Sequence, residues 1–250
     1  MQDMIVDKIN ISGNPGDSQN IINEQCTLVD DILTMKESTL FKKRVFDILF
    51  STIGLICFIP IFILIAILIK VDSPGPILYK QTRIGKSGKE FEIYKFRKMR
   101  FDIGDQGLKI TTTNDARMTN FGKIMKKYKI DELPQFWNVL RGDMSFVGPR
   151  PETPNYVETY DEMQREILRI KPGITDYASL EYINEGDLLE NSSDPNGFYI
   201  EKLIPKKIEY NLQYIKDMSI KTDLKIIFLT IWKTIRQAGD KDEGDNISRG

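Results

Sequence analysis

The sequence predicts an α+β fold that is mostly helical and contains one small β-hairpin. Three observations lead to this prediction. Residues 48–69 form a long apolar stretch without a charged side chain. Residues 77–84 and 91–99 alternate between apolar and polar side chains on either side of a turn that contains two glycines. Several later segments repeat apolar side chains at helical spacing, so we expect most of the remaining chain to be helical.

The chain has 250 residues, enough for one sizeable domain with appendages. Residues 1–38 are polar and show no sustained periodicity, so we expect a mobile extension there. This extension does not look like a secretory signal peptide, because the apolar stretch begins too late. Residues 39–71 are predicted to form a membrane helix, residues 72–238 a folded domain and residues 239–250 a charged tail.

The apolar stretch is about 22 residues long, and a straight helix of that length would cover about 33 Å, enough to cross a bilayer. Pro60 lies near its middle, where proline removes a hydrogen bond and kinks a helix. Basic side chains flank both ends, and positive charges favour the cytoplasmic side of a membrane. A helix that bends at Pro60 and returns to the same face would satisfy both flanks. The residues alone leave a re-entrant helix and a spanning helix equally open.

Residues 77–99 are predicted to form the β-hairpin, and lysine and arginine are frequent along it. This basic segment is either a site for an anionic ligand or a solvated surface. Helical spacing over residues 121–128 predicts a helix with Thr119 or Asn120 as its N-cap. The next helix is expected to begin near Asp131 and to end at Gly142, because glycine favours the position after a helix.

The C-terminal part is expected to contain a helix over residues 155–170, an acidic loop over residues 184–197 and two amphipathic segments. In the second of these segments, residues 223–235, the apolar side chains share one helical face. Such a face packs in the core of most proteins, and the alternative is a helix that lies in the membrane interface.

The sequence contains no histidine, which excludes Ser-His and Cys-His nucleophilic catalysis and histidine metal sites. The two cysteines, Cys26 and Cys57, cannot make a zinc site. No disulfide framework is visible, which fits a reducing, cytosolic location for the soluble part of the chain. The net charge of -1 gives no sign of a nucleic-acid-binding protein. Acid–base or metal chemistry must therefore rest on carboxylates, and anion binding on lysine and arginine.

The adjacent carboxylates Asp131 and Glu132 are the main candidates for such chemistry. Neighbours inside a helix point about 100° apart, but at a helix start both carboxylates can converge. A helix N-terminus binds phosphate and favours an ionised carboxylate, the form that a nucleophile or a metal ligand needs. Taken alone, the pair is more often an acidic helix cap. The surrounding cations favour the catalytic interpretation; they are Lys123, Lys126, Lys127, Lys129, Arg141 and Arg150.

Arg150 lies in a loop that two prolines and a glycine stiffen, so its guanidinium is held in a fixed place. Arginine binds phosphate oxygens through two parallel hydrogen bonds. A surface arginine in a structural turn explains the loop equally well when the loop is taken alone.

Six motifs occur along the chain in a characteristic order. They are KRVFD at residues 43–47, YKFRKM at 94–99, DARMT at 115–119, IDELPQ at 130–135, NVLRGDMSFVGPRP at 138–151 and KPGIT at 171–175. Together they strongly resemble the bacterial sugar transferase family, the small monotopic phosphoglycosyl transferases. The resemblance covers about residues 40–238, and its long run over residues 131–151 is highly specific.

The resemblance implies transfer of a sugar 1-phosphate from a nucleotide sugar, usually a UDP-sugar, to a polyprenyl (undecaprenyl) phosphate, with release of UMP. It implies that Asp131 is the nucleophile and forms a covalent phosphosugar intermediate. Glu132 would assist and, with Asp131 beside it, bind Mg²⁺. Lys95, Lys126 and Arg150 would supply cations around the phosphates.

The resemblance also implies a location. The apolar stretch would be a re-entrant helix with its break at Pro60, held among the lipids of a bacterial inner membrane. Residues 72–238 would be the catalytic domain on the cytoplasmic face, and the last helices would be interfacial. The enzyme would start a surface polysaccharide or glycoconjugate pathway. No nucleic-acid partner is expected, and the sugar, the pathway and the oligomeric state, a homo-oligomer included, stay open.

Three positions and one segment depart from the usual pattern of the family. Ile59 precedes Pro60 where serine is frequent, Lys126 stands where arginine is usual, and Lys129 stands where a small hydroxyl residue is common. Residues 174–179 differ from the frequent Thr-Gly-Trp-Ala form. Two other functions compete with the transferase. One is a non-catalytic membrane scaffold whose basic hairpin binds anionic lipid, and the other is a phosphatase that uses Asp131.

Overall fold

The structure, a computed structural model, describes residues 34, 36–100, 115, 117–183 and 185–247. The extension predicted over residues 1–38 therefore lies almost wholly outside the described residues. The described part is mostly helical and contains two small strand pairs, in agreement with the predicted fold class.

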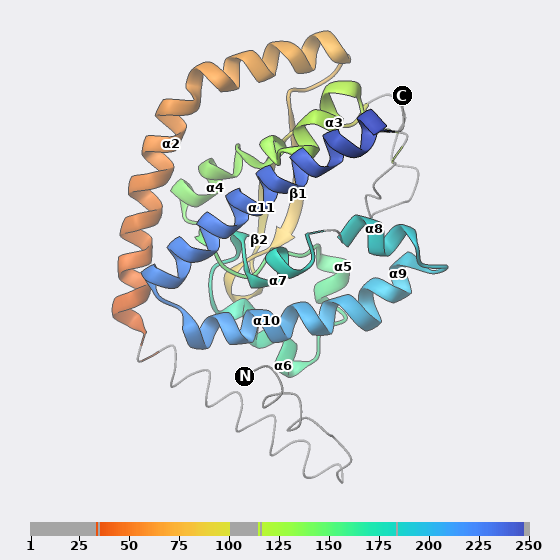
Figure 1. Ribbon diagram of the computed structural model, residues 1–250. Coiled ribbons are helices and arrows are strands. Elements are labelled where there is room, and N and C mark those ends of the chain that lie inside the picture. The colour runs from red at the N-terminus through yellow and green to blue at the C-terminus, as the bar shows by residue number, and fades with distance from the viewer. Residues whose placement is uncertain (1–33, 35, 101–114, 116, 184, 248–250) are drawn as a thin grey trace.

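The apolar stretch lies in one long helix, α2 (Glu37–Asp72), which contains Pro60. Figure 1 shows that α2 bends on its way around the outside of the molecule. Among the described helices, α2 alone is long and apolar enough to cross a membrane, and only 11% of its most apolar 18-residue stretch is buried. Apolar side chains such as Ile56 and Ile63 are exposed along it. This exposure is unlike the core helix of a soluble protein and suits a helix that associates with a membrane.

The predicted hairpin is confirmed. β1 (Leu78–Ile84) and β2 (Glu90–Phe96) pair in antiparallel orientation, and a 3₁₀ turn, η2 (Lys86–Gly88), joins them. β2 lies nearer the core, because Ile93 and Phe96 are buried. The basic residues at the end of β2 are therefore carried to the edge of the core.

The helix predicted after residue 119 is also confirmed. α3 (Asn120–Lys127) begins at Thr119, whose hydroxyl oxygen accepts a hydrogen bond from the amide of Gly122 at 2.9 Å. A single 3₁₀ turn, η3 (Ile130–Glu132), follows α3 and contains both candidate carboxylates. Lys129 joins the two elements.

The helix expected to begin near Asp131 starts later. α4 (Gln135–Arg141) has Pro134 as its N-cap, so the carboxylates precede the α-helix instead of occupying its first turn. The predicted end is confirmed, because Gly142 caps α4 in the left-handed conformation at φ 93°. A side chain at this φ would be strained.

A second strand pair was not predicted, since residues 145–154 were expected to be loop. β3 (Ser145–Val147) and β4 (Gly173–Thr175) are parallel neighbours. Each strand has three residues, too few for an alternating pattern, and the pairing depends on contacts between distant parts of the chain. Gly148 and Gly173 permit the close approach, because a Cβ on either would collide with the backbone of the other segment.

The prediction of one helix over residues 155–170 is wrong. The segment is divided into α5 (Pro154–Val157), α6 (Glu162–Arg165) and a 3₁₀ turn, η4 (Glu166–Arg169). Asp161 breaks the segment, because its side chain caps α6 in a capping box with Gln164.

The acidic segment is not a continuous loop either. It contains α8 (Glu185–Glu190) and α9 (Pro195–Phe198), and the side chain of Asp194 caps α9. α7 (Tyr177–Glu181) precedes them, and a short π-helix, η5 (Tyr199–Leu203), follows.

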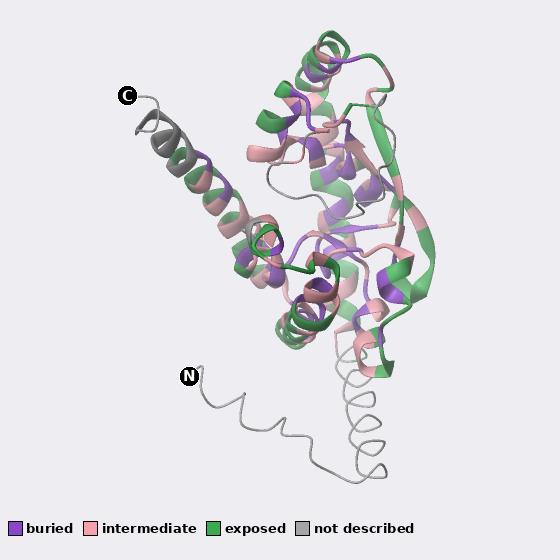
Figure 2. Cartoon of the chain, turned by 90° about the vertical axis from the view of Figure 1, so that its right-hand side faces the viewer, coloured by how far each residue is buried: buried purple, intermediate pink, exposed green. Residues whose placement is uncertain are grey.

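Two long helices close the chain, α10 (Ile204–Asp217) and α11 (Ile220–Ile247). α11 therefore continues beyond residue 239, where the charged tail was expected to begin. Tyr214 of α10 and Ile226 of α11 are fully buried against Val147 of β3. Figure 2 shows that buried residues gather in the interior of the domain, between these helices and the strands.

Candidate active site

Asp131 is buried, with 2% of its surface exposed, and Glu132 is partly buried, with 11% of its side chain exposed. Successive residues of a 3₁₀ turn point about 120° apart, so the two carboxylates meet different partners. The partners come from the end of β2 and from the loop after β3. The site is thus built by η3, the hairpin and the β3–β4 pair together.

Glu132 lies between two cations. Its Oε1 accepts a hydrogen bond from Lys95 Nζ at 2.9 Å and another from the Arg150 guanidinium. Burial alone would raise the pKa of Glu132, but the charges of Arg150 and Lys95 outweigh burial and hold the pKa well below its ordinary value. Glu132 in turn raises the pKa of Arg150. Glu132 is therefore a carboxylate anion that fixes both cations.

Asp131 has one paired and one open oxygen. Lys98 Nζ donates to its Oδ2 at 2.8 Å. Its Oδ1 accepts no hydrogen bond from a described residue. A carboxylate held on one oxygen and open on the other has the arrangement that an attacking group requires.

Arg150 is held in place through its backbone as well as its side chain. Its amide donates to Asp176 Oδ2 at 3.2 Å, and Asp176 Oδ1 accepts from the Ser179 amide at 2.7 Å, which caps α7. The guanidinium also donates to the carbonyl oxygen of Ile174 in β4 at 3.3 Å. The unpredicted strand pair therefore explains how a loop residue acquires a fixed position.

Lys95, whose side chain is 14% exposed, lies beside Glu132. Burial lowers its pKa to about 8, although Glu132 opposes the shift. A lysine with this pKa carries its charge at neutral pH and loses it in mildly alkaline solution.

Of the predicted site residues, the structure brings together Asp131, Glu132, Lys95 and Arg150. Lys126 lies in the last turn of α3, where its charge helps to lower the pKa of Asp115, after the larger effects of Arg117. Pro60 lies within α2.

Two cations near the carboxylates were not predicted as site residues. The sequence places Lys98 only within the YKFRKM motif, because the predicted strand runs to residue 99 and gives no sign that β2 ends at Phe96. Lys129 was expected only to add to the cations around the carboxylates and to depart from the family pattern. Its unusual backbone, with φ 53°, has no clear signature in the sequence.

A magnesium ion at this site would need oxygen ligands from Asp131 and Glu132. Among the described residues, no three Asp, Glu or Cys side chains are grouped to hold a metal by themselves. Mg²⁺, however, is commonly bound by one or two carboxylates together with the phosphates of a substrate. Asp131 and Glu132 fit this second kind of site.

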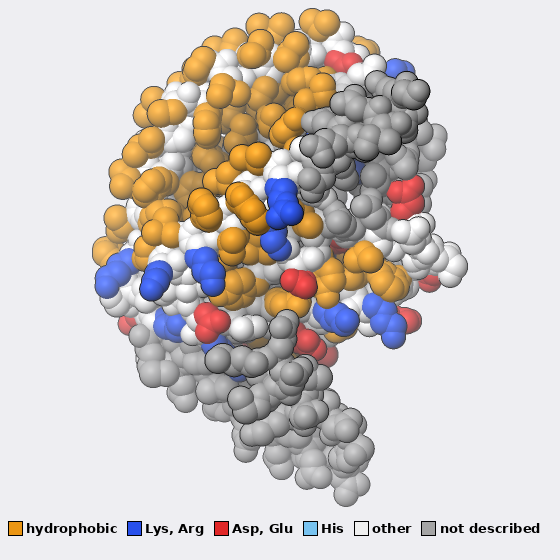
Figure 3. Space-filling model, in the orientation of Figure 1, with side chains coloured by type: hydrophobic (Ala, Val, Ile, Leu, Met, Phe, Trp, Pro, Cys, Tyr) orange, Lys and Arg blue, Asp and Glu red, His pale blue; other side chains and the backbone are white. Residues whose placement is uncertain are grey.

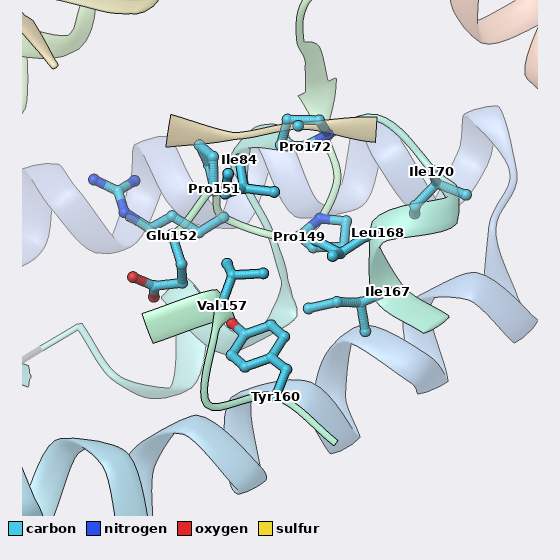
Figure 4. Close-up of a pocket in the computed structure, with 12 residues that line it drawn as sticks. Ile84, Pro149, Pro151, Glu152, Val157, Tyr160, Ile167, Leu168, Ile170 and Pro172 are labelled. Carbon is cyan, nitrogen blue, oxygen red and sulfur yellow. The ribbon is translucent and has the colours of Figure 1, made fainter. Parts of the chain in front are cut away.

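A small cavity of about 10 Å³ lies behind the Arg150 loop. Figure 4 shows Pro149 and Pro151 on one side of it and Tyr160 and Ile167 on the other. The cavity is too small for a nucleotide or a sugar, so it reflects packing behind the loop.

A second cluster of charges, which are partly buried, lies close to this cavity. Glu152 accepts a hydrogen bond from the Tyr199 hydroxyl and lies 3.7 Å from Arg83 and 4.0 Å from Lys207. Lys207 also pairs with Glu185 at 2.7 Å. Burial, together with Glu152, raises the pKa of Tyr199 well above its ordinary value.

Comparison with known proteins identifies one family and several similar proteins. A family model described as bacterial sugar transferase matches residues 38–237. The UDP-N-acetylgalactosamine-undecaprenyl-phosphate N-acetylgalactosaminephosphotransferase of Aeromonas hydrophila is 39% identical, over 76% of this chain and 43% of its own length. The UDP-glucose:undecaprenyl-phosphate glucose-1-phosphate transferase of Escherichia coli (strain K12) is 37% identical, over 76% of this chain and 39% of its own length.

Another relative is matched over most of its length. The exopolysaccharide production protein PSS of Rhizobium leguminosarum bv. phaseoli is 39% identical, over 76% of this chain and 92% of its own length. The chain therefore spans about two fifths of the Aeromonas and Escherichia proteins and nearly all of the Rhizobium protein.

Proposed function

The chain belongs to the bacterial sugar transferase family, and on this premise we propose that it transfers a sugar 1-phosphate from a UDP-sugar to undecaprenyl phosphate and releases UMP. The observation that carries the proposal is the state of Asp131. It is a buried carboxylate with one oxygen fixed by Lys98 and the other open, beside cations that suit phosphate. Phosphoryl transfer depends mainly on positioning and charge neutralisation, which this arrangement provides without histidine.

In the first step, Asp131 Oδ1 attacks the phosphorus that carries the sugar. A bond forms between Oδ1 and phosphorus, and the bond between this phosphorus and the UMP oxygen breaks. UMP leaves with the electron pair. In the second step, an oxygen of undecaprenyl phosphate attacks the same phosphorus, and the bond to Asp131 breaks.

The neighbouring side chains have separate roles in this scheme. Lys98 orients Asp131, while Lys95 and Arg150 bind phosphate oxygens and neutralise the charge that develops on them. Glu132 positions both cations before substrate arrives. Mg²⁺, held by Glu132 and Asp131 with the substrate phosphates, would supply further charge neutralisation.

We further propose that α2 is re-entrant, so that both of its ends face the cytoplasm of a bacterial cell at the inner membrane. The support is that both ends contact the same domain. Near the start, Lys43 forms a buried ion pair with Asp223 of α11. Just after the end, Arg97 donates to the carbonyl oxygens of Ser73 and Pro76 at 2.8 and 2.6 Å. A straight helix of about 54 Å would carry its ends to opposite sides of a bilayer.

The exposed face of α11 supports the same arrangement. Phe228 is 68% exposed and Ile235 is 63% exposed. The neighbouring apolar residues Ile231 and Trp232 are also exposed. Figure 3 shows apolar side chains of α2 and α11 gathered over one face of the molecule. This face would lie in the membrane interface and hold the catalytic residues near the headgroup of the lipid substrate.

The transferase is tested by giving the purified chain Mg²⁺, undecaprenyl phosphate and a panel of UDP-sugars. UMP together with a lipid-linked sugar is the expected result. Inorganic phosphate would instead indicate a phosphatase, and no turnover over a wide panel would indicate a scaffold.

The topology is tested by cysteine labelling after Cys26 and Cys57 have been changed to serine. Lys42→Cys and Lys80→Cys place single thiols on the two flanks of α2. An impermeant maleimide should label both only after the inner membrane is opened. Labelling of one position in intact spheroplasts would mean that α2 spans the membrane.

A further inference from the structure

Lys129 has an unusual backbone at the edge of the site. It adopts the left-handed conformation at φ 53° and ψ 24°, and Ser87 in the hairpin turn is the other described non-glycine residue with positive φ. Its amide donates to the carbonyl oxygen of Lys126, and its carbonyl oxygen accepts from the amide of Glu132, both at 3.2 Å. Left-handed backbone is unfavourable for lysine, and such strain is often found at functional sites. The left-handed backbone between α3 and η3 thus sets the direction of the Lys129 side chain.

The Lys129 ammonium group lies in the electrostatic field of the site without a partner of its own. The charged groups that most affect the pKa of Lys129 are Glu132, Arg150 and Asp176. Unlike Lys95 and Lys98, it forms no ion pair or side-chain hydrogen bond with any described residue. Burial, only partly offset by Glu132, lowers its pKa.

The charges around the carboxylates do not balance. Four cations, Lys95, Lys98, Lys129 and Arg150, face Asp131, Glu132 and Asp176. Glu185 also acts on Arg150, but Glu185 is already paired with Lys207 at 2.7 Å. Both oxygens of Asp176 already accept backbone amides. A half-buried cation without a counter-ion is unfavourable. An anion from outside the chain would therefore stabilise this excess positive charge.

We propose that Lys129 binds a phosphate oxygen of a substrate, as an additional phosphate-binding residue beside Lys95 and Arg150. The inference rests on the proposed function only for the source of this phosphate, which is either the diphosphate of the nucleotide sugar or the phosphate of the lipid. An ammonium group has three donors on a flexible stem, so it can follow a phosphate oxygen between the two steps.

The test separates the charge of Lys129 from its backbone role. Asparagine tolerates the left-handed conformation better than lysine, so Lys129→Asn removes the charge without adding strain. Lys129→Arg keeps the charge. Lys206→Met, at an exposed position on α10, is the matched control for loss of a lysine.

Binding is measured on the full chain in detergent, with UDP as one probe and undecaprenyl phosphate as the other. Lys129→Asn is expected to raise the Kd of at least one probe about tenfold, with an unchanged or higher Tm, because a charge-assisted hydrogen bond is lost. Lys129→Arg should bind within about threefold of the original chain. The probe whose Kd rises identifies the source of the phosphate.

Kd values for both probes within about twofold of the original chain would overturn the proposal, as would equal weakening in Lys206→Met. Because binding is measured without turnover, the result does not depend on the transferase assay. Weaker UDP binding by Lys129→Asn in a chain that releases no UMP would uphold Lys129 as a phosphate-binding residue and reject the proposed function.

Discussion

Two partly buried charge clusters share the loop that carries Arg150 and Glu152, and they differ in the balance of their charges. In the Glu152 cluster, two cations, Arg83 and Lys207, face two carboxylates, Glu152 and Glu185. The cluster is closed by a tyrosine hydroxyl and by the apolar core around it. The two positive and two negative charges neutralise one another, as in an ion-pair network with a structural role.

The Asp131 cluster is unbalanced. It has more cations than free carboxylates, one cation without a partner, and one carboxylate oxygen that no described residue contacts. The comparison shows that burial and shifted pKa values do not by themselves identify a catalytic site, because both clusters have them. Uncompensated charge and an open acceptor distinguish the two.

The largest expected effect is that of Asp131→Asn. Asparagine preserves the shape but cannot attack phosphorus, so activity should fall by at least about 10³-fold. UMP release would be measured together with the thermal unfolding curve. Retained activity in a folded variant would contradict the assignment of the nucleophile.

Arg150→Ala is expected to lower kcat/KM about 100-fold, since it removes a fixed guanidinium from the phosphates. Arg150→Lys should recover only part of this loss, because an ammonium group cannot form two parallel hydrogen bonds. Steady-state kinetics of the two variants check the prediction. Full activity in Arg150→Lys would show that only the charge matters.

A smaller effect is expected on the pH dependence. The pKa of Lys95 is lowered to about 8, so its positive charge is present below pH 8 and is lost as the pH rises through this value. kcat/KM should therefore decline above pH 8, by up to about tenfold per pH unit. Lys95→Arg stays charged and should remove this decline over pH 7–10; an identical decline in the variant would assign it to another group.

The smallest effect on activity is expected from Glu152→Gln. The change leaves Arg83 and Lys207 without a full counter-charge, so the free energy of unfolding should fall by about 2 kcal/mol or more. Below its unfolding temperature, the variant should keep activity within about threefold. Denaturant unfolding and kinetics on the same sample test this; a large loss of activity without loss of stability would place Glu152 in the catalytic machinery.

Local patterns were sufficient to predict part of the fold. The hairpin, α3 with its Thr119 cap and the Gly142 cap each depend on neighbouring residues, whose preferences can be seen in the sequence. The β3–β4 pair depends on contact between segments about 28 residues apart along the chain, which no local pattern encodes. The break at Asp161 was missed because a helical apolar pattern continues across it.

Local patterns likewise predicted some residues of the site and missed others. The motifs identified Asp131, Glu132, Lys95 and Arg150, and the structure brings these four together. The roles of Lys98 and Lys129 could not be predicted, because they depend on where β2 ends and on a left-handed residue after α3. A shift of one residue there turns a side chain toward the site or away from it.

The most direct test of the account is to look for the covalent intermediate. The full chain would be incubated with an accepted UDP-sugar in the absence of undecaprenyl phosphate, and its intact mass and proteolytic peptides measured. The account predicts one equivalent of UMP and a sugar-phosphate adduct on Asp131, which disappears when undecaprenyl phosphate is added. UMP release that strictly requires the lipid, with no adduct at any time, would contradict Asp131 as the nucleophile.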